Sequence, residues 1–490
     1  MGKRLSRQRQ RAGVTTFLLS IIAISTLSVS YAAQAVNTIY STGTISYLPR
    51  VDVTVNVNQV IGVNNLSLGF MLDHEWNIWL NRPVLKQLAR DANFKLVRLF
   101  SHRIEPCSYW NEATKTGTFN WANVDTLVQE IFNIGAEPLI CIGFCDSTQI
   151  IIPPGMAINA TTGLPNPESF AAYCAEWVKH FKQTQKLVKY YEILNEPWMY
   201  FGWDNYTRIS YFMEVFNTAA RSMRKENLIL LGFEGANRKP VLNYWLSNGG
   251  ADLDFISFHK YDSGEINYYA DSVMLTRAET LQLESSTAYY GIRELKQIYK
   301  QYRGKTPIVI NSESNFNSAC ETGTDPKIQQ MLGATWVALM LRKAVLSGLD
   351  YSVYYSFASS ASWERQNKES GGVGFGMVNF DNNSPWYPYY CQWLIGKNLN
   401  VGDQIVVSES SSEDIRTLSW VQSGKIVILI ISKVDQPRIL YLNGISQQQF
   451  NIIKIDNTIP WENANIQTGT INSAEPLNLN GYTIALLQSV

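Results

Sequence analysis

The 490-residue sequence predicts an α/β protein, a (β/α)8 TIM barrel with an accompanying all-β sandwich domain. Between residues 67 and 395, short apolar segments alternate with longer amphipathic ones, which is typical of strand-helix units around a parallel sheet. On both sides of this region the sequence changes to short β-rich runs separated by clusters of Asn, Gly, Ser and Gln. These two observations define the predicted architecture.

The expected barrel strands are short, and each precedes a loop rich in polar or aromatic residues. They are 68–70, 96–100, 137–142, 190–194, 228–232, 254–258, 308–310 and 351–355. Eight strands with crossovers in about 330 residues match the size of a (β/α)8 barrel with insertions. The alternative is a doubly wound open sheet. That fold would carry a Gly-rich phosphate loop after its first strand, where this chain has Asp73-His74-Glu75.

Apolar residues at helical spacing predict the crossovers between the strands. Val124, Leu127, Val128 and Ile131 form one such face, and Gly135 is placed to end that helix. Further helices are expected at 168–185, 207–225, 284–302 and 328–347.

The β-rich segments give the domain organisation. We expect residues 36–66 to contribute N-terminal strands to the β-sandwich, 67–395 to form the catalytic barrel, and 396–490 to form the C-terminal β-sandwich. Valine occupies the alternate positions 51, 53, 55 and 57, so the first segment has the same β-rich pattern as the C-terminal strands. The two ends of the chain are therefore predicted to share one sandwich.

Residues 1–35 read as a signal peptide or a membrane anchor. Five basic residues precede an uncharged, largely apolar run from Val14 to Val29, and Ala33-Gln34-Ala35 supplies the small residues that a signal peptidase needs. The apolar run is shorter than a usual membrane-spanning helix, which favours cleavage over retention. We therefore expect a secreted, extracellular protein, with membrane attachment through residues 14–35 as the alternative.

Composition excludes several classes of partner and cofactor. Lys+Arg and Asp+Glu both number 41, so the chain lacks the positive field expected of a nucleic-acid-binding protein. The six cysteines are widely scattered without the paired spacing of a zinc site, although some could form disulfides in an exported chain. Asp73, His74 and Glu75 also lack metal-ligand spacing, and substrate contacts or helix capping suffice to explain them. We expect no metal, no cofactor and no nucleic acid.

Two acids stand where predicted strands end. The run from Tyr190 stops at Asn195-Glu196-Pro197, where proline removes a backbone donor and disfavours the right-handed helical region for Glu196. The run 308–310 leads to Glu313. In a barrel the carboxyl ends of all strands converge on one face, so the two acids can face each other. A facing pair of carboxyl groups is the catalytic apparatus of most glycosidases.

These motifs resemble glycoside hydrolase clan A, whose members are retaining (β/α)8 enzymes. The resemblance implies that Glu196 is the acid/base, Glu313 the nucleophile and Asn195 a ligand of the sugar 2-hydroxyl. The layout is most similar to family 39, which includes β-xylosidases and α-L-iduronidases, with a family 5-like enzyme as second choice. Many relatives place an aromatic residue after the nucleophile, whereas this chain has Ser314.

Four further residues are candidates for substrate binding. Arg98 is a charge inside an apolar strand, and it could hydrogen-bond the nucleophile or form a structural ion pair. His259 and Tyr261 follow the sixth strand, where similar clan A enzymes place groups beside the nucleophile; a structural histidine and a rim tyrosine are the alternatives. Trp363 lies in the loop after the eighth strand and is either a platform for a sugar ring or a packing residue.

The sequence therefore predicts an exported retaining glycoside hydrolase, β-xylosidase-like or related, acting on an oligosaccharide or polysaccharide. One alternative is an endo-acting glucanase or mannanase of the same clan, which would use the same two acids. The other is a non-catalytic carbohydrate-binding protein of the cell surface. The presence of both Glu196 and Glu313 argues against the non-catalytic alternative.

Overall fold

The computed structural model describes residues 48–490 except 146–148, 203–204, 266, 320–325 and 361–373. The predicted signal or anchor segment, Trp363 and Cys320 lie outside the described residues. In the described part of the chain, no helix combines the length and apolar character needed to cross a membrane. The other five cysteines, at 107, 141, 145, 174 and 391, are buried.

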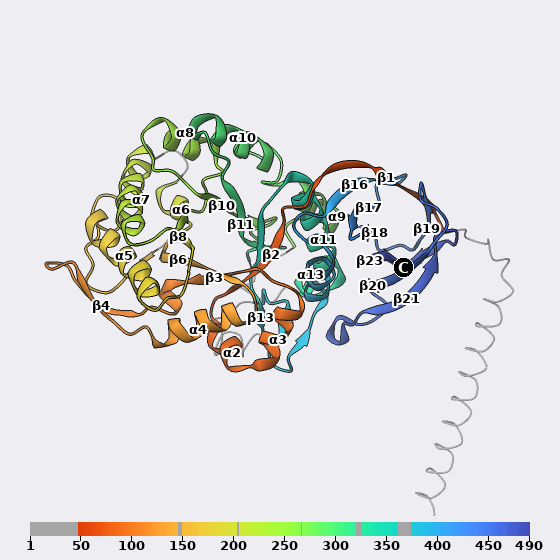
Figure 1. Ribbon diagram of the computed structural model, residues 1–490, viewed down its shortest axis with the longest axis horizontal. Coiled ribbons are helices and arrows are strands. Elements are labelled where there is room, and N and C mark those ends of the chain that lie inside the picture. The colour runs from red at the N-terminus through yellow and green to blue at the C-terminus, as the bar shows by residue number, and fades with distance from the viewer. Residues whose placement is uncertain (1–47, 146–148, 203–204, 266, 320–325, 361–373) are drawn as a thin grey trace, which may run out of the picture. The chain divides into compact units, whose positions relative to one another are not determined.

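Eight parallel strands form a closed barrel, so the predicted fold class is confirmed (Figure 1). Each strand pairs with the next in chain order, and the eighth pairs with the first. A bridge between Glu234 and Ser257 joins the fifth and sixth strands. The strands are β2 (Ser67–Leu72), β3 (Leu96–Phe100), β6 (Glu137–Cys145), β8 (Tyr190–Asn195), β9 (Leu230–Gly232), β10 (Phe255–Tyr261), β11 (Ile308–Asn315) and β12 (Tyr351–Tyr354).

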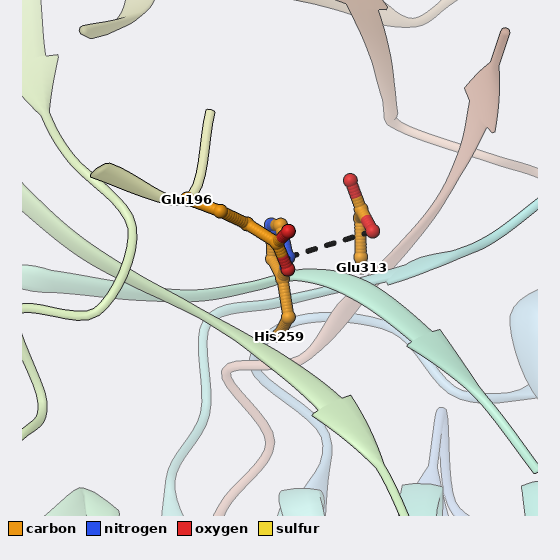
Figure 2. Close-up of side chains that lie close together, drawn as sticks. All are labelled: Glu196, His259 and Glu313. Atoms are coloured by element: carbon orange, nitrogen blue, oxygen red, sulfur yellow. Dashed lines mark hydrogen bonds and ion pairs between the residues drawn. The ribbon is translucent and has the colours of Figure 1, made fainter. Parts of the chain in front are cut away.

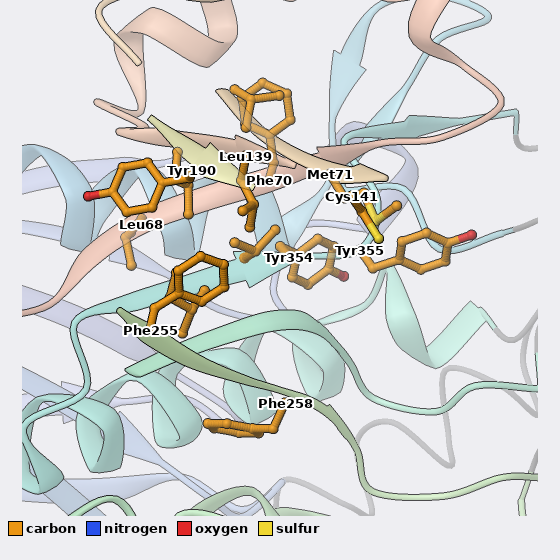
Figure 3. Packing of buried hydrophobic residues seen from close by; sticks show 14 of the residues in the cluster. Leu68, Phe70, Met71, Leu139, Cys141, Tyr190, Phe255, Phe258, Tyr354 and Tyr355 are labelled. Carbon is orange, nitrogen blue, oxygen red and sulfur yellow. The ribbon is translucent and has the colours of Figure 1, made fainter. Parts of the chain in front are cut away.

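Apolar side chains from both faces of these strands are buried in one hydrophobic cluster with the surrounding helices (Figure 3). Phe70 in β2 and Leu139 in β6 are fully buried, as is Phe255 in β10. The strands are covered on both faces, which is why they read in the sequence as continuous apolar runs instead of alternating ones.

Helices follow the strands and lie outside them, as α5, α7, α8 and α10 show in Figure 1. The helices are α2 (Trp76–Asn81), α3 (Pro83–Asp91), α4 (Ala122–Asn133), α5 (Pro167–Gln183), α6 (Pro197–Phe201), α7 (Tyr206–Glu226), α8 (Lys239–Ser247), α9 (Asp271–Thr280), α10 (Ile292–Arg303), α11 (Met331–Ser347) and α13 (Tyr387–Asn398). Short elements in the loops are η1 (Ser101–Arg103), β4 (Cys107–Asn111), β5 (Thr116–Phe119), β7 (Ile150–Ile151), η3 (Pro326–Ile328), β13 (Ala358–Ser359), β14 (Val378–Asn379) and β15 (Ser384–Pro385).

The helix predicted at 284–302 begins later than expected, at Ile292. Hydroxyl groups in the preceding segment bond to nearby backbone instead. The Ser285 hydroxyl accepts from the Gly291 N–H at 3.1 Å, and the Ser286 hydroxyl accepts from the Tyr289 N–H at 3.1 Å. Local bonds of this kind compete with helix formation, and apolar spacing alone does not reveal them.

A second, nine-stranded sheet forms the sandwich. Its strands are β1 (Arg50–Val63), β16 (Gln404–Ser410), β17 (Ile415–Gln422), β18 (Lys425–Ser432), β19 (Arg438–Asn443), β20 (Gln449–Ile455), β21 (Gln467–Asn472), β22 (Leu477–Leu479) and β23 (Ile484–Ser489), with η5 (Trp461–Asn463) between β20 and β21. β1 lies between β16, to which it is antiparallel, and β19, to which it is parallel. The described N-terminal segment therefore shares a sheet with the C-terminal strands.

Strand β18 has two buried faces. Val427, Leu429 and Ile431 belong to the same hydrophobic cluster as the barrel, whereas Ile428 and Ile430 belong to the separate core of the sandwich. Successive side chains of a strand point to opposite faces, so an unbroken apolar run serves both cores at once.

Candidate active site

A cavity of about 590 Å³ opens at the carboxyl ends of the barrel strands. Glu196 and Glu313 both line it, together with Asn195, His259 and Tyr261. These five residues come from β8, β10 and β11 or the residue that follows β8. The structure thus brings five of the predicted site residues into one cavity.

Glu196 occupies a constrained backbone position between β8 and α6. Its φ and ψ are 42° and 46°, in the left-handed region, and Leu194 also has a positive φ of 59°. Pro197, the first residue of α6, excludes the right-handed helical conformation as expected, but the extended alternative is not adopted either. A left-handed non-glycine residue costs roughly 1–2 kcal/mol. Such strain is typical of functional sites.

Glu313 is almost fully buried near the end of β11, and both of its carboxylate oxygens accept hydrogen bonds. Arg98 donates to Oε1 at 2.5 Å and the Tyr261 hydroxyl donates to Oε2 at 2.8 Å. Burial raises the pKa of Glu313 above its ordinary value, and Glu196 adds to the rise, while His259, Arg98 and Tyr261 oppose it. The carboxylate is thus fixed in orientation by two donors.

Arg98 links three polar side chains beneath the cavity. It has no solvent exposure, and besides Glu313 it bonds Glu192 through Nε at 2.7 Å and the Asn195 side-chain oxygen at 2.9 Å. Burial would raise the pKa of Glu192, but Arg98, His259 and Ser257 outweigh it and lower that pKa. Arg98 therefore makes both contacts that the sequence left as alternatives, the structural ion pair with Glu192 and the hydrogen bond to Glu313.

His259 lies between the two acids (Figure 2). Its Nδ1 is 2.9 Å from Glu196 Oε1 and 3.5 Å from Glu313 Oε2. Burial lowers the pKa of His259 to about 4, because the surrounding structure disfavours the imidazolium. The ring is therefore neutral near pH 7. With the proton on Nδ1 it can donate to one carboxylate without adding a charge.

One oxygen each of Glu196 and Glu313, with a His259 nitrogen, lie within 4.8 Å of one another. By geometry alone, these three atoms could hold a cation. However, both Glu313 oxygens already accept from donors, and the Arg98 guanidinium at 2.5 Å supplies a fixed positive charge that repels a second one. The donor set suits a pair of reacting carboxyl groups better than a metal.

Asp73 follows β2, the first barrel strand, and lines the same cavity as Glu196 and Glu313. The Tyr355 hydroxyl donates to it at 2.6 Å and Arg103 Nε donates at 2.5 Å. Burial raises the pKa of Asp73, but His74, Arg103 and Tyr355 outweigh it and lower that pKa. The sequence left substrate contact and helix capping as alternatives for this cluster. Asp73 lines the cavity and does not cap a helix, so its position is consistent with substrate contact.

The sequence interpretation missed a group of cavity residues. Trp198, Glu234, Arg238 and Gln282 form one wall, and Tyr355 provides an aromatic side chain at the end of the eighth strand. Glu234 stands two positions after β9, so the reasoning that selected Glu196 and Glu313 could have selected it as well. Gln282 follows a helix, where no pattern in the sequence marks a site.

The fold and the position of the two acids match the clan A layout that the sequence resembles. Solved structures with this architecture include a monomeric β-xylosidase from Caulobacter crescentus CB15, which has a TM-score of 0.62 and 11% identity, and covers 89% of this chain and 99% of that one. A GH39 enzyme from Xanthomonas axonopodis pv. citri has a TM-score of 0.62 and 10% identity, over 92% and 99%.

An α-L-arabinofuranosidase from Thermotoga maritima, solved as an arabinose complex, is similar as well. It has a TM-score of 0.62 and 12% identity, over 90% of this chain and 100% of that one. No protein-family model matches the sequence, and no curated protein matches it. At such low identity the similarity establishes the fold, and the chemistry has to be argued from the site.

Proposed function

We propose that this protein is a retaining glycoside hydrolase in which Glu313 is the nucleophile and Glu196 the acid/base. The observation that carries the proposal is the carboxyl pair, whose nearest oxygens lie within 4.8 Å at the ends of the fourth and seventh barrel strands. Retaining enzymes hold their two carboxyl groups about 5–5.5 Å apart, whereas inverting enzymes need about 6.5–9.5 Å to admit a water molecule.

The reaction would proceed by double displacement. Glu313 attacks the anomeric carbon while Glu196 gives its proton to the glycosidic oxygen, so the leaving group departs as an alcohol and a glycosyl ester forms. Glu196, now a carboxylate, takes a proton from water, and the water oxygen displaces Glu313 from the anomeric carbon. Each step returns the net charge of the pair, which suits a buried site.

The surrounding groups support these roles. Arg98 and Tyr261 orient Glu313, and the side-chain amide of Asn195, whose oxygen accepts from Arg98 at 2.9 Å, reaches the cavity beside Glu196. His259 remains neutral beside both acids, so it does not cancel the charge that changes during the cycle. We assign Asn195, His259 and Tyr261 to contacts with the sugar or with the reacting carboxylates, and Arg98 to positioning.

For the substrate we propose a β-linked oligosaccharide or polysaccharide, with a β-xyloside as first choice. The similar solved structures include a β-xylosidase, a bifunctional glucanase-xylanase and an endoxylanase. An endo-acting glucanase or mannanase would use the same acids and is the second candidate. Export, with or without membrane attachment through residues 14–35, rests on the N-terminal sequence alone.

The first prediction concerns the two acids and uses aryl β-glycosides of xylose, glucose, mannose and galactose. The wild type should release the phenol from at least one of them, and Glu313→Ala should lower kcat by about 10⁴-fold or more, because no covalent intermediate can form. Added azide should restore release in both variants. With Glu313→Ala the product should be the α-glycosyl azide, and with Glu196→Ala the β-glycosyl azide.

The matched control is Glu168→Ala, which removes an exposed carboxyl group from the outer helix α5 and should leave turnover unchanged. If the two azide products have the opposite configurations, the roles of Glu196 and Glu313 are exchanged. If a folded wild type binds glycans and cleaves neither aryl glycosides nor polysaccharides, the non-catalytic alternative replaces this proposal.

A further inference from the structure

One wall of the cavity has no role in the double displacement. It consists of Trp198 in α6, Glu234 and Arg238 in the segment between β9 and α8, and Gln282 after α9. The segment after β9 packs closely on Trp198, since a Cβ atom at Gly235 would lie 2.7 Å from Trp198 Cδ1. Gly235 also has a φ of 86°, which a residue with a side chain rarely adopts. The close packing and the positive φ of Gly235 thus fix the position of this wall.

Two polar side chains in this wall each have one oxygen without a hydrogen-bond partner among the described residues. Glu234 is 2% exposed and its Oε2 has no hydrogen-bond partner among the described residues; Gln282 is 8% exposed and the same holds for its Oε1. Buried polar atoms are nearly always hydrogen-bonded, so such atoms need an explanation. Both belong to residues that line the cavity, where a ligand with hydroxyl groups would supply the missing partners.

An aromatic surface lies next to these groups. The Arg238 guanidinium carbon is 3.4 Å from the Trp198 ring centroid and 5.3 Å from that of Tyr289, so a cation-π stack holds the indole in place. Flat apolar faces next to a few fixed hydrogen-bonding groups are the usual components of a small-molecule subsite. A sugar ring offers the matching combination of C–H and O–H groups.

The barrel order shows which part of the substrate this wall would meet. Strand β9 adjoins β8, which leads to Glu196, whereas Glu313 lies on β11, next to β12. In the proposed mechanism Glu313 bonds to the sugar that stays, and Glu196 contacts the oxygen of the group that leaves. A wall on the Glu196 side therefore faces the leaving group.

We infer that Trp198, Glu234, Arg238 and Gln282 form a leaving-group subsite that selects a sugar over an apolar aglycone; this rests on the proposed function. Burial raises the pKa of Glu234 well above the usual range; Arg238 opposes the rise, while Glu196, Glu192 and Glu313 add to it. Burial therefore favours the neutral carboxylic acid form of Glu234, which can donate a hydrogen bond to one sugar hydroxyl. Gln282 Oε1 accepts from another.

The test compares two substrates with the same glycone: the aryl β-glycoside and the β-1,4-linked disaccharide of the sugar that the aryl panel selects, for example xylobiose. Glu234→Ala removes the carboxyl group that would donate to the sugar hydroxyl. It should lower kcat/KM for the disaccharide about tenfold, equivalent to about 1.4 kcal/mol, and change kcat/KM for the aryl glycoside less than twofold. Gln282→Ala should show the same substrate-dependent loss.

Glu105→Ala is the matched control, because Glu105 is a second, partly buried acid whose pKa is raised by burial to about 7, and it does not line the cavity. It should alter both substrates equally or not at all. Equal losses on both substrates in the Glu234 and Gln282 variants, or no loss, would overturn the subsite. Calorimetric binding of xylobiose and of xylose to the Glu313→Ala protein tests the subsite without turnover. A preference for the disaccharide that the added Glu234 or Gln282 substitution abolishes supports the subsite, and equal affinity for the two sugars refutes it. Inactivity towards every aryl glycoside would count against the proposed function instead.

Discussion

Arg98 shows how much one residue can organise in this site. Its guanidinium contacts Glu192, Asn195 and Glu313, so a single buried cation positions Glu313 and the residue before Glu196. The sequence made Arg98 conspicuous, because a charge within an apolar strand must find partners when buried. It left open whether Arg98 bonds the predicted nucleophile or forms a structural ion pair, since its partners come from strands 94 to 215 positions away in the chain.

The second prediction concerns the pH dependence set by Glu313. The nucleophile must be ionised, and its pKa is raised above the ordinary value of 4.5, so kcat/KM should fall with decreasing pH at a higher pH than a normal glutamate would give. The Tyr261 hydrogen bond lowers this pKa. Tyr261→Phe should therefore move the acidic limb of the kcat/KM profile to still higher pH, with the activity loss greatest in acid.

Tyr351→Phe is the control for this experiment. Tyr351 is the first residue of β12 and lies away from the cavity. The substitution removes its hydroxyl group, which bonds the Tyr190 hydroxyl. Its pH profile should coincide with that of the wild type. An acidic limb that stays in place in Tyr261→Phe would show that Glu313 does not set it.

At the scale of elements, the end of β8 was partly predictable. The apolar run and Asn195-Glu196-Pro197 identified a strand with an acid at its end. The left-handed conformation of Leu194 and Glu196 was not visible, because the rule for residues before proline favours an extended chain. The neighbouring strand β6 packs closely on this turn, since the Cys145 thiol donates to the Asn195 carbonyl at 2.8 Å. The wall after β9 was missed for a similar reason, because packing and not sequence order assembles it.

The third prediction tests the contact between β6 and β8. Gly143 in β6 has a φ of 74°, and a Cβ atom there would lie 2.6 Å from Leu194 Cδ2, two residues before Glu196. Gly143→Ala should therefore displace Leu194 and with it the acid/base. We expect a loss of stability greater than the roughly 1–2 kcal/mol of the left-handed backbone alone, and a fall in kcat of at least tenfold.

Gly135→Ala separates the two contributions. Gly135 also has a positive φ, 82°, but an added Cβ atom would have no atom within 4 Å. This variant should lose stability through backbone strain while its kcat stays unchanged. Thermal unfolding and steady-state kinetics on both variants make the comparison. If Gly143→Ala retains full kcat, the packing of Leu194 does not hold Glu196 in place.

For the molecule as a whole, the sequence predicted two domains from their different residue patterns. It did not predict how the two domains contact each other. The structure shows that the barrel and the C-terminal sheet share buried surface. Leu429 in β18 and Leu486 in β23 belong to the same hydrophobic cluster as the barrel residues. Arg342 in α11 donates to the Thr417 carbonyl at 2.7 Å, and the Tyr387 hydroxyl donates to the Asp456 carbonyl at 2.7 Å. Apolar runs in the sequence gave no indication of which face would meet the barrel.

The fourth prediction is that the sandwich and the barrel unfold together, because strand β18 belongs to both cores. Leu429→Ala removes barrel-facing contacts and Leu487→Ala removes contacts within the sandwich core, and each should cost about 2–5 kcal/mol. Scanning calorimetry should show one transition in the wild type and in both variants, shifted down by a few degrees, with activity lost over the same temperature range. If Leu487→Ala instead splits the transition, and activity survives the first step, the sandwich is an independent unit whose folding the barrel does not need.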